Sequence, residues 1–240
     1  MSGKERTEAA NRHLGLTLAF VAGAVNAGGF LAVSQYTSHM TGVVSSLADN
    51  LALGQFAAVS AGTAALVSFL CGAATTALLV NWAARKRLRS RYALALMLEA
   101  ALLLVFGFFG ARLRSVQEFS ASATVLLLCY IMGLQNAIIT KVSDAVIRTT
   151  HVTGLMTDLG IELGKLVYWN ADPSIHKTVE ADRPKMALLS SLLGLFFSGG
   201  LVGAFGFKYA GFVAIIPLSA LLFVIAIVPV WDDMTLPLED

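Results

Sequence analysis

The sequence predicts an all-α polytopic membrane protein, with six transmembrane helices arranged as two inverted-topology three-helix repeats. Three observations lead to this prediction: an apolar composition, an internal repeat and a one-sided distribution of basic residues. Hydrophobic residues make up 57% of the 240-residue chain and charged residues only 13%, whereas a soluble domain carries about 25% charged residues. The chain has too few charges to cover a water-exposed surface, so we expect it to lie in a lipid bilayer.

A short motif, Thr-x-His-x-Thr-Gly, occurs in both halves of the chain, at residues 37–42 and 149–154. Upstream of each copy, an apolar run contains Gly-x-x-Asn-Ala, with Asn26 in the first half and Asn136 in the second. Self-similarity on this scale indicates a duplicated unit. We therefore assign residues 1–117 to a first three-helix repeat and residues 118–240 to a second, within a single membrane domain.

Six apolar segments are long enough to cross a hydrocarbon core of about 30 Å. They cover residues 14–34, 56–83, 93–111, 121–140, 186–206 and 210–230. The first segment also resembles a secretory signal peptide, because Ala22-Gly23-Ala24 mimics a cleavage site. We reject that interpretation because the segment contains Asn26, whose counterpart lies deep in the second half. Each motif copy follows a span and is expected to form a broken or re-entrant segment.

The basic residues indicate the orientation in the membrane. They gather in the N-terminus, in the Arg85–Arg91 loop and between Lys141 and Lys185. With six spans, these three segments share one side with the C-terminus, and the positive-inside rule places that side in the cytoplasm. Eight spans would put the Arg85–Arg91 loop outside the cell, so six spans are favoured.

Three spans per half give the two halves opposite orientations. The first motif copy then lies near the external face and the second near the cytoplasmic face. Many secondary transporters use this arrangement, and their binding sites form at interrupted helices in matching positions. The candidate substrate- or ion-binding residues are therefore the polar residues of the repeated segments, namely Asn26, His39, Thr41, Asn136, His151, Thr153, Asp158 and Glu162.

The second motif copy carries the stronger polar pattern. On a helix, His151, Asp158 and Glu162 fall on one face. An amphipathic helix lying at the membrane interface explains the same pattern. Of the two carboxylates, we prefer Asp158 for ion or proton coupling, because Lys165 lies one turn beyond Glu162 and is able to neutralise it.

The repeated residues also have structural interpretations. The histidines suit hydrogen-bonded helix caps, contacts to a substrate, or proton transfer, and Thr41 and Thr153 suit helix caps. Asn26 and Asn136 either join helices or line the site, because an unpaired amide inside a span is costly. Glu99 lies inside the third span, where a carboxylate is a functional candidate by default; pairing with the basic loop is the alternative.

The motifs together resemble a known family. Gly-x-x-Asn-Ala, Thr-Ser-His-Met-Thr-Gly and the block from Gln135 to Gly164 are similar to the YoaK-like bacterial inner-membrane protein family (domain of unknown function 1275). The resemblance extends over nearly the whole chain, although members often carry aspartate at the position of Asn26. It implies a multi-pass protein of the bacterial inner (plasma) membrane, and it supplies no substrate or activity.

The sequence favours a small-solute secondary transporter or channel-like permease with a site at the interface of the two repeats. The alternatives are an intramembrane enzyme that uses the His, Asp and Glu set, and a non-transporting membrane scaffold or sensor. The sequence shows no nucleophile–base pair, metal-site spacing or nucleotide motif, so we expect no enzyme activity, metal or cofactor. The expected partners are the lipid bilayer and an unknown small solute or ion, without nucleic acid. Whether the chain forms a homo-oligomer is left open.

Overall fold

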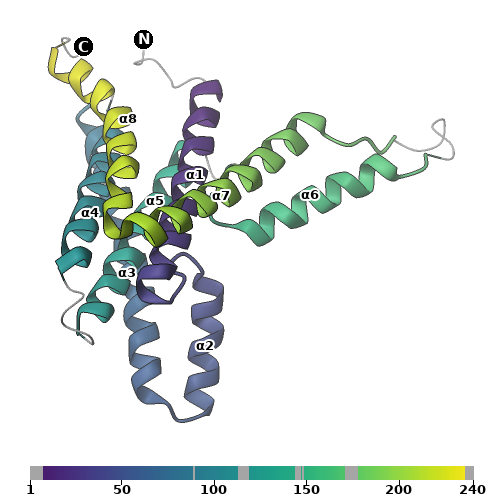
Figure 1. The fold of residues 1–240 in the computed structure, drawn as a ribbon. Coiled ribbons are helices and arrows are strands. Elements are labelled where there is room, and N and C mark those ends of the chain that lie inside the picture. Colours follow the sequence, from purple (N-terminus) through teal and green to yellow (C-terminus); the bar gives the residue numbers. More distant parts are fainter. Residues whose placement is uncertain are drawn as a thin grey trace.

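The computed structural model describes residues 8–88, 90–112, 119–143, 147, 149–170 and 178–235. All regular elements in these ranges are helices, which confirms the all-α prediction (Figure 1). In order, they are α1 (Glu8–Val33), α2 (Met40–Ala52), α3 (Phe56–Arg85), α4 (Ala93–Arg112), α5 (Phe119–Val142), α6 (Val152–Val167), α7 (Arg183–Ala210), the 3-10 helix η2 (Gly211–Ala214) and α8 (Ile215–Thr235).

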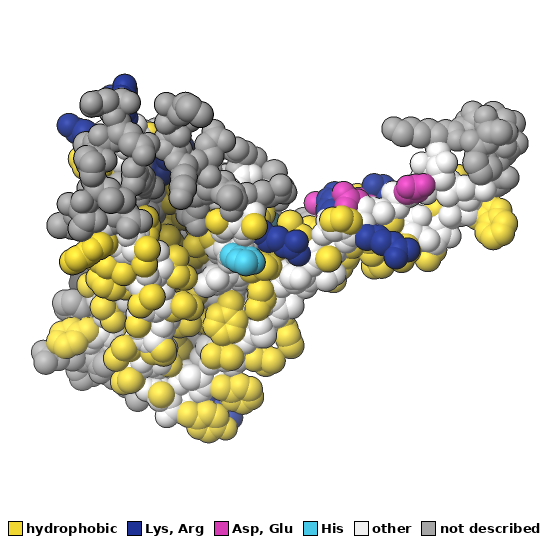
Figure 2. Space-filling view, turned by 90° about the horizontal axis from the view of Figure 1, so that it is seen from above, with side chains coloured by type: hydrophobic (Ala, Val, Ile, Leu, Met, Phe, Trp, Pro, Cys, Tyr) yellow, Lys and Arg dark blue, Asp and Glu magenta, His cyan; other side chains and the backbone are white. Residues whose placement is uncertain are grey.

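The long helices have the length and composition of membrane spans. Within the described residues, four segments qualify: Ala9–Val33, Phe56–Arg85, Ser122–Val142 and Arg183–Trp231. The last contains α7, η2 and nearly all of α8, and a shorter apolar helix covers Ala93–Phe108 within α4. Large apolar side chains lie on the outside of these helices (Figure 2). Phe197, for example, is 67% exposed. These features fit a multi-pass protein whose outer surface contacts lipid.

The two helices that follow the Thr-x-His-x-Thr-Gly motif are short. Helix α2 has 13 residues and α6 has 16, which correspond to about 20 Å and 24 Å. Both lengths fall below the roughly 30 Å of a hydrocarbon core. Helix α2 packs against α3, and α6 against α7. Each pair forms a hairpin that projects from the bundle (Figure 1).

The bundle is held together by close pairs of helices: α1 with α7, α3 with α5, and α4 with α8. Glycine allows the first two pairs to approach. A Cβ atom on Gly23 would lie 2.0 Å from the carbonyl oxygen of Phe196, and one on Gly133 would lie 2.0 Å from that of Phe69. Gly23 and Gly133 are the equivalent glycines of the two Gly-x-x-Asn-Ala motifs. The first glycine of this motif therefore makes the same type of contact in both halves.

A second glycine contact recurs in the opposite direction. Gly72 on α3 faces the carbonyl oxygen of Tyr130 on α5, and Gly199 on α7 faces that of Phe20 on α1, each at 2.0 Å from an added Cβ. Small residues at helix interfaces are characteristic of membrane proteins, in which backbones approach closely. Two helices from one half thus pack against two helices from the other half by equivalent contacts.

Candidate functional site

A cavity of about 940 Å³ opens where α1, the end of α5, α6 and the start of α7 meet. Three of the candidate residues lie in its wall: His151, Thr153 and Asp158, all from the second motif copy and α6. Leu155, Leu188 and Leu189 contribute apolar surface. The cavity therefore combines apolar walls with a few polar groups, the usual character of a small-molecule site.

Charges of both signs line this cavity. Arg12 comes from α1, Lys185 from α7 and Asp158 from α6. A second acid, Asp182, caps α7 by accepting a hydrogen bond from the backbone N–H of Lys185 at 2.9 Å. Asp158 makes no hydrogen bond or ion pair with another described residue. Its carboxylate is thus available to a ligand.

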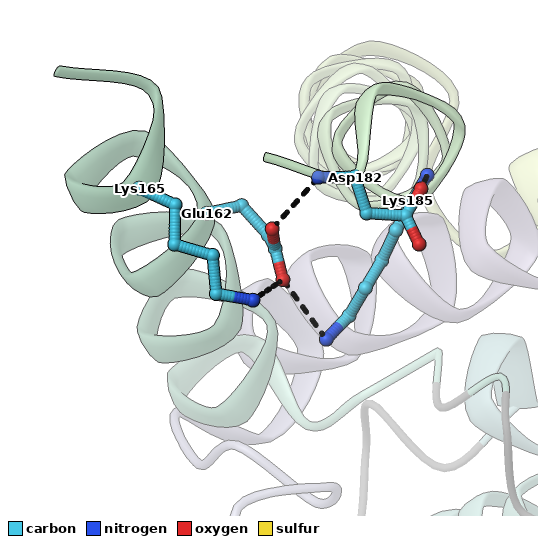
Figure 3. A network of polar contacts seen from close by, with 4 residues as sticks. All are labelled: Glu162, Lys165, Asp182 and Lys185. Atoms are coloured by element: carbon cyan, nitrogen blue, oxygen red, sulfur yellow. Dashed lines mark hydrogen bonds and ion pairs between the residues drawn. The ribbon is translucent and has the colours of Figure 1, made fainter. Parts of the chain in front are cut away.

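Glu162 lies one turn beyond Asp158 on α6. Figure 3 shows the surroundings of Glu162, which are formed by Lys165, Asp182 and Lys185. The Glu162 side chain is 2% exposed, and its Oε2 accepts a hydrogen bond from the backbone N–H of Asp182 at 3.0 Å. Its Oε1 accepts a hydrogen bond from Lys165 Nζ at 2.9 Å and lies 3.6 Å from Lys185 Nζ. The pKa of this carboxyl lies below its usual value. The main cause is the hydrogen bond from the Asp182 backbone N–H, and the second is the hydrogen bond from Lys165. Glu162 is thus an ionised brace between α6 and the start of α7.

We expect this brace to make stability depend on pH. A carboxyl whose pKa is lower in the folded state stabilises the fold above its unfolded pKa of about 4.3, and this contribution is lost as the pH falls through the folded pKa. Glu162→Gln should therefore lower the melting temperature in detergent at pH 7, and the difference from wild type should shrink below about pH 4. The control is Asp158→Asn, which removes no described contact and should melt like wild type at both pH values. A Glu162→Gln protein that melts like wild type at pH 7 would show that the brace contributes nothing.

The two asparagines anchor the motif segments. Asn26 Oδ1 accepts a hydrogen bond from Ser38 Oγ at 2.8 Å, and Asn136 Oδ1 accepts one from Thr150 Oγ1. Ser38 and Thr150 are equivalent residues, each directly before the motif histidine. In each half, the asparagine of Gly-x-x-Asn-Ala is therefore hydrogen-bonded to the residue directly before the histidine of Thr-x-His-x-Thr-Gly. The asparagines were expected either to join helices or to line the site. These hydrogen bonds support a joining role, between a long helix and the motif segment that follows it.

The helix caps differ from the expectation. The N-cap positions of α2 and α6 are occupied by His39 and His151, and neither side chain makes a capping hydrogen bond. Thr41 and Thr153 lie two residues after these N-cap positions, inside the first turn, so the capping role expected for them is wrong. The cause is that each helix begins directly after the histidine.

The histidines of the two copies occupy different surroundings. The His39 ring packs on its own helix, since a Cβ on Gly42 would lie 2.3 Å from its Cδ2 atom. In the second copy, no atom lies within 4 Å of a Cβ added to Gly154. His151 lines the cavity instead. The two copies of the motif therefore differ in the position of the histidine ring, although both histidines are exposed.

The structure assembles part of the expected site. His151, Thr153 and Asp158 share the cavity, whereas Glu162 belongs to the brace and the asparagines to the anchors. His39 and Thr41 are exposed residues of the first copy and do not line this cavity. Among the described residues, no group of three or more His, Cys, Asp or Glu side chains is placed to hold a metal ion.

Sequence reasoning missed the basic groups of the cavity. In the sequence, Arg12 and Lys185 belong to the basic segments that indicate the membrane orientation. Both lie just outside an apolar segment, near the cytoplasmic end expected for it, where lysine and arginine are common for topological reasons. Their shared position at the second motif copy was therefore not visible in the sequence.

Comparisons with known proteins place the chain in a family without giving it an activity. No curated protein and no solved structure matches the chain. Residues 14–228 match the model of a family described as a protein of unknown function, DUF1275. This match covers most of the chain and agrees with the resemblance seen in the motifs, so the chain belongs to the DUF1275 family.

Proposed function

We propose that this protein is a small-solute secondary transporter or channel-like permease with its site at the interface of the two repeats. The observation that supports this proposal is the cavity of about 940 Å³, because α1 of the first half and α5 to α7 of the second half line it together. Its polar groups include His151, Thr153 and Asp158 from the second motif copy. In transporters, broken segments at a repeat interface form such sites.

The lining also suggests the class of solute. Arg12 and Lys185 offer positive charge, Asp158 offers negative charge, and Thr153 and Thr157 offer hydroxyl groups. A small polar solute that carries both an anionic and a cationic group suits this combination. A purely apolar solute does not, because it would leave these polar groups desolvated and unpaired.

Six spans, inverted repeats, an inner-membrane location and cytoplasmic termini are part of the same proposal. The recurrence of the glycine contacts and of the Asn–Ser and Asn–Thr anchors supports the repeat. With this topology the cavity faces the cytoplasm, since Arg12 and Lys185 lie on the basic side of the membrane.

Cysteine labelling tests this orientation. In a background without Cys71 and Cys129, the exposed Lys86 and Lys208 are each replaced by cysteine. We expect an impermeant thiol reagent to reach Lys86→Cys only from the cytoplasmic side and Lys208→Cys only from the opposite side. Labelling of both from the same side would contradict the six-span topology.

Solute binding and uptake test the function. Purified protein is screened for stabilisation by small polar solutes, because a ligand that binds only the folded state stabilises it by about 2.7 kcal/mol at 100 times its Kd. The solutes that stabilise the protein are then tested for uptake into proteoliposomes. Uptake above that of protein-free liposomes is expected. A panel in which stabilising solutes are found but none enters would favour a sensor instead.

An intramembrane enzyme is less well supported. Such an enzyme would use the His, Asp and Glu set of the second copy as one unit. Glu162, however, is held by Lys165 and Lys185 and is directed to the α6–α7 contact, while Asp158 lines the cavity. The three side chains therefore do not form a nucleophile–base arrangement of the usual kind.

A further inference from the structure

Glu99 is the most deeply buried carboxylate among the described residues. It lies on α4, is 0% exposed, and belongs to a stretch in which Leu96, Ala100 and Leu103 are buried in the apolar core. Its Oε1 accepts a hydrogen bond from Gln135 Nε2 on α5 at 2.8 Å. It forms no ion pair with a described residue, so the pairing with the basic loop that the sequence left open is not observed there. The interaction partner of Glu99 is an amide.

The remaining atoms of this pair are both acceptors. Glu99 Oε2 and Gln135 Oε1 are buried, and neither has a hydrogen-bond partner. An ionised Glu99 has no proton to donate, so Glu99 Oε2 and Gln135 Oε1 both stay without a hydrogen bond. A proton on Oε2 supplies the one donor that the pair lacks. The protonated carboxyl and the amide are then joined by two hydrogen bonds. Gln135 Nε2 donates to Glu99 Oε1, and the protonated Glu99 Oε2 donates to Gln135 Oε1.

The charges around the pair do not favour an ionised carboxylate. The helices and the 3-10 helix that pack against α4 are α3, α5, α8 and η2. The described side chains of α8 and η2 include no ionisable group, and Arg85 and Lys141 lie at the ends of α3 and α5. The other ionisable groups on α3 and α5 are Cys71, Cys129 and Tyr130, and Tyr130 Oη donates to Thr75 Oγ1 at 2.7 Å. An unpaired charge in such surroundings is strongly disfavoured.

The internal repeat shows that this pair is not part of the shared framework. The position equivalent to Gln135 in the first Gly-x-x-Asn-Ala motif is Val25, which is buried and apolar. Helix α8, the counterpart of α4, carries no carboxylate among its described side chains. Helix α4 packs against α5, whereas the described parts of α8 and α1 make no comparable contact. Both members of the pair are thus additions to one half.

We propose that Glu99 and Gln135 form a proton-binding site between α4 and α5, in which the Glu99 carboxyl carries a proton at neutral pH and donates it in a hydrogen bond to the Gln135 amide oxygen. The ligand of this site is the proton itself, taken up from water and released to water without any other reactant. The site is separate from the solute cavity and does not depend on the proposed transport. Tyr92 Oη donates to the carbonyl oxygen of Lys141 at 3.2 Å and joins the same two segments nearer the basic loop.

Infrared spectroscopy of the purified protein in detergent tests this proposal. A protonated carboxyl has a carbonyl stretching band that a carboxylate lacks, and 13C-labelled glutamate identifies the band as glutamate. At pH 7 we expect one such glutamate band in wild type and none in Glu99→Gln, which keeps the size of the side chain. The matched control is Glu162→Gln. Because the Asp182 backbone N–H and the two lysines keep Glu162 ionised, this variant should keep the band.

A second variant keeps Glu99 itself. Gln135→Val installs the residue that the first repeat carries at this position and removes the amide. We expect the carboxyl band to remain but to move, because its O–H group loses the acceptor. No glutamate carboxyl band in wild type at pH 7, or a band that Glu99→Gln leaves unchanged, would overturn the proposal. An ionised Glu99 bridged to Gln135 by water would give the first of these results.

Discussion

Replacing Gly133 by alanine is expected to lower the free energy of unfolding by about 3 kcal/mol, the upper end of the range for overpacking a core. The new methyl group would lie 2.0 Å from the carbonyl oxygen of Phe69. That oxygen belongs to the backbone of α3, so no side-chain rotation relieves the contact, and α3 and α5 must separate. Gly23→Ala should have the same effect between α1 and α7, where the oxygen is that of Phe196. Thermal unfolding in detergent measures both.

Gly160→Ala provides the matched control. Gly160 lies on α6, and no atom is found within 4 Å of an added Cβ. Alanine is favoured over glycine inside a helix by roughly 0.5–1 kcal/mol, so this variant should melt at the wild-type temperature or slightly above it. If Gly133→Ala melts like Gly160→Ala, α3 and α5 are not packed backbone to backbone.

Asp158→Asn is expected to abolish gradient-driven uptake of the solute identified by the screen, with a loss of at least about tenfold, or about 1.4 kcal/mol. Asp158 lines the cavity and has no hydrogen bond or ion pair among the described residues. A carboxylate that is not neutralised by the protein is able to bind a cationic group of the solute or a coupling ion. The amide has nearly the same size but no charge, so folding and membrane insertion should be unchanged.

Glu162→Gln is the comparison for this experiment. It removes a carboxylate on the same helix, one turn away, that already has Lys165 and Lys185 as partners. We expect it to retain uptake at a temperature at which it is folded. Wild-type uptake by Asp158→Asn between about pH 5 and 8 would exclude Asp158 as the coupling or solute-binding carboxylate.

Most of the helix positions follow from hydropathy. The predicted segments 56–83 and 93–111 correspond to Phe56–Arg85 and Ala93–Arg112, because an apolar run flanked by polar residues sets the length of a span. The predicted bounds of the first and fifth segments, 14–34 and 186–206, agree less well with α1 (Glu8–Val33) and α7 (Arg183–Ala210). Helix α7 begins at Arg183 because Asp182 caps it, and a helix continues into water wherever its first turn is capped.

The contacts between helices were not predictable in the same way. Asn136 and Thr150 both stood out in the sequence, but their hydrogen bond requires the chain to turn back after α5. The pairing of Glu99 with Gln135 depends on the register of α4 against α5. Hydropathy gives the apolar faces of helices, but it does not give the rotation or the height at which two such faces meet.

The exchange of helices between halves has a consequence for biogenesis. Helix α1 ends at Val33, but its main partner, α7, begins at Arg183, about 150 residues later. At a synthesis rate of about 5–20 residues per second, α1 waits roughly 8–30 s for that partner to emerge from the ribosome. During this interval the glycine-containing surface of α1 faces lipid or the insertion machinery. Helix α3 waits a much shorter time for α5, so among the three close pairs of the bundle α3–α5 is the first that the nascent chain is able to complete.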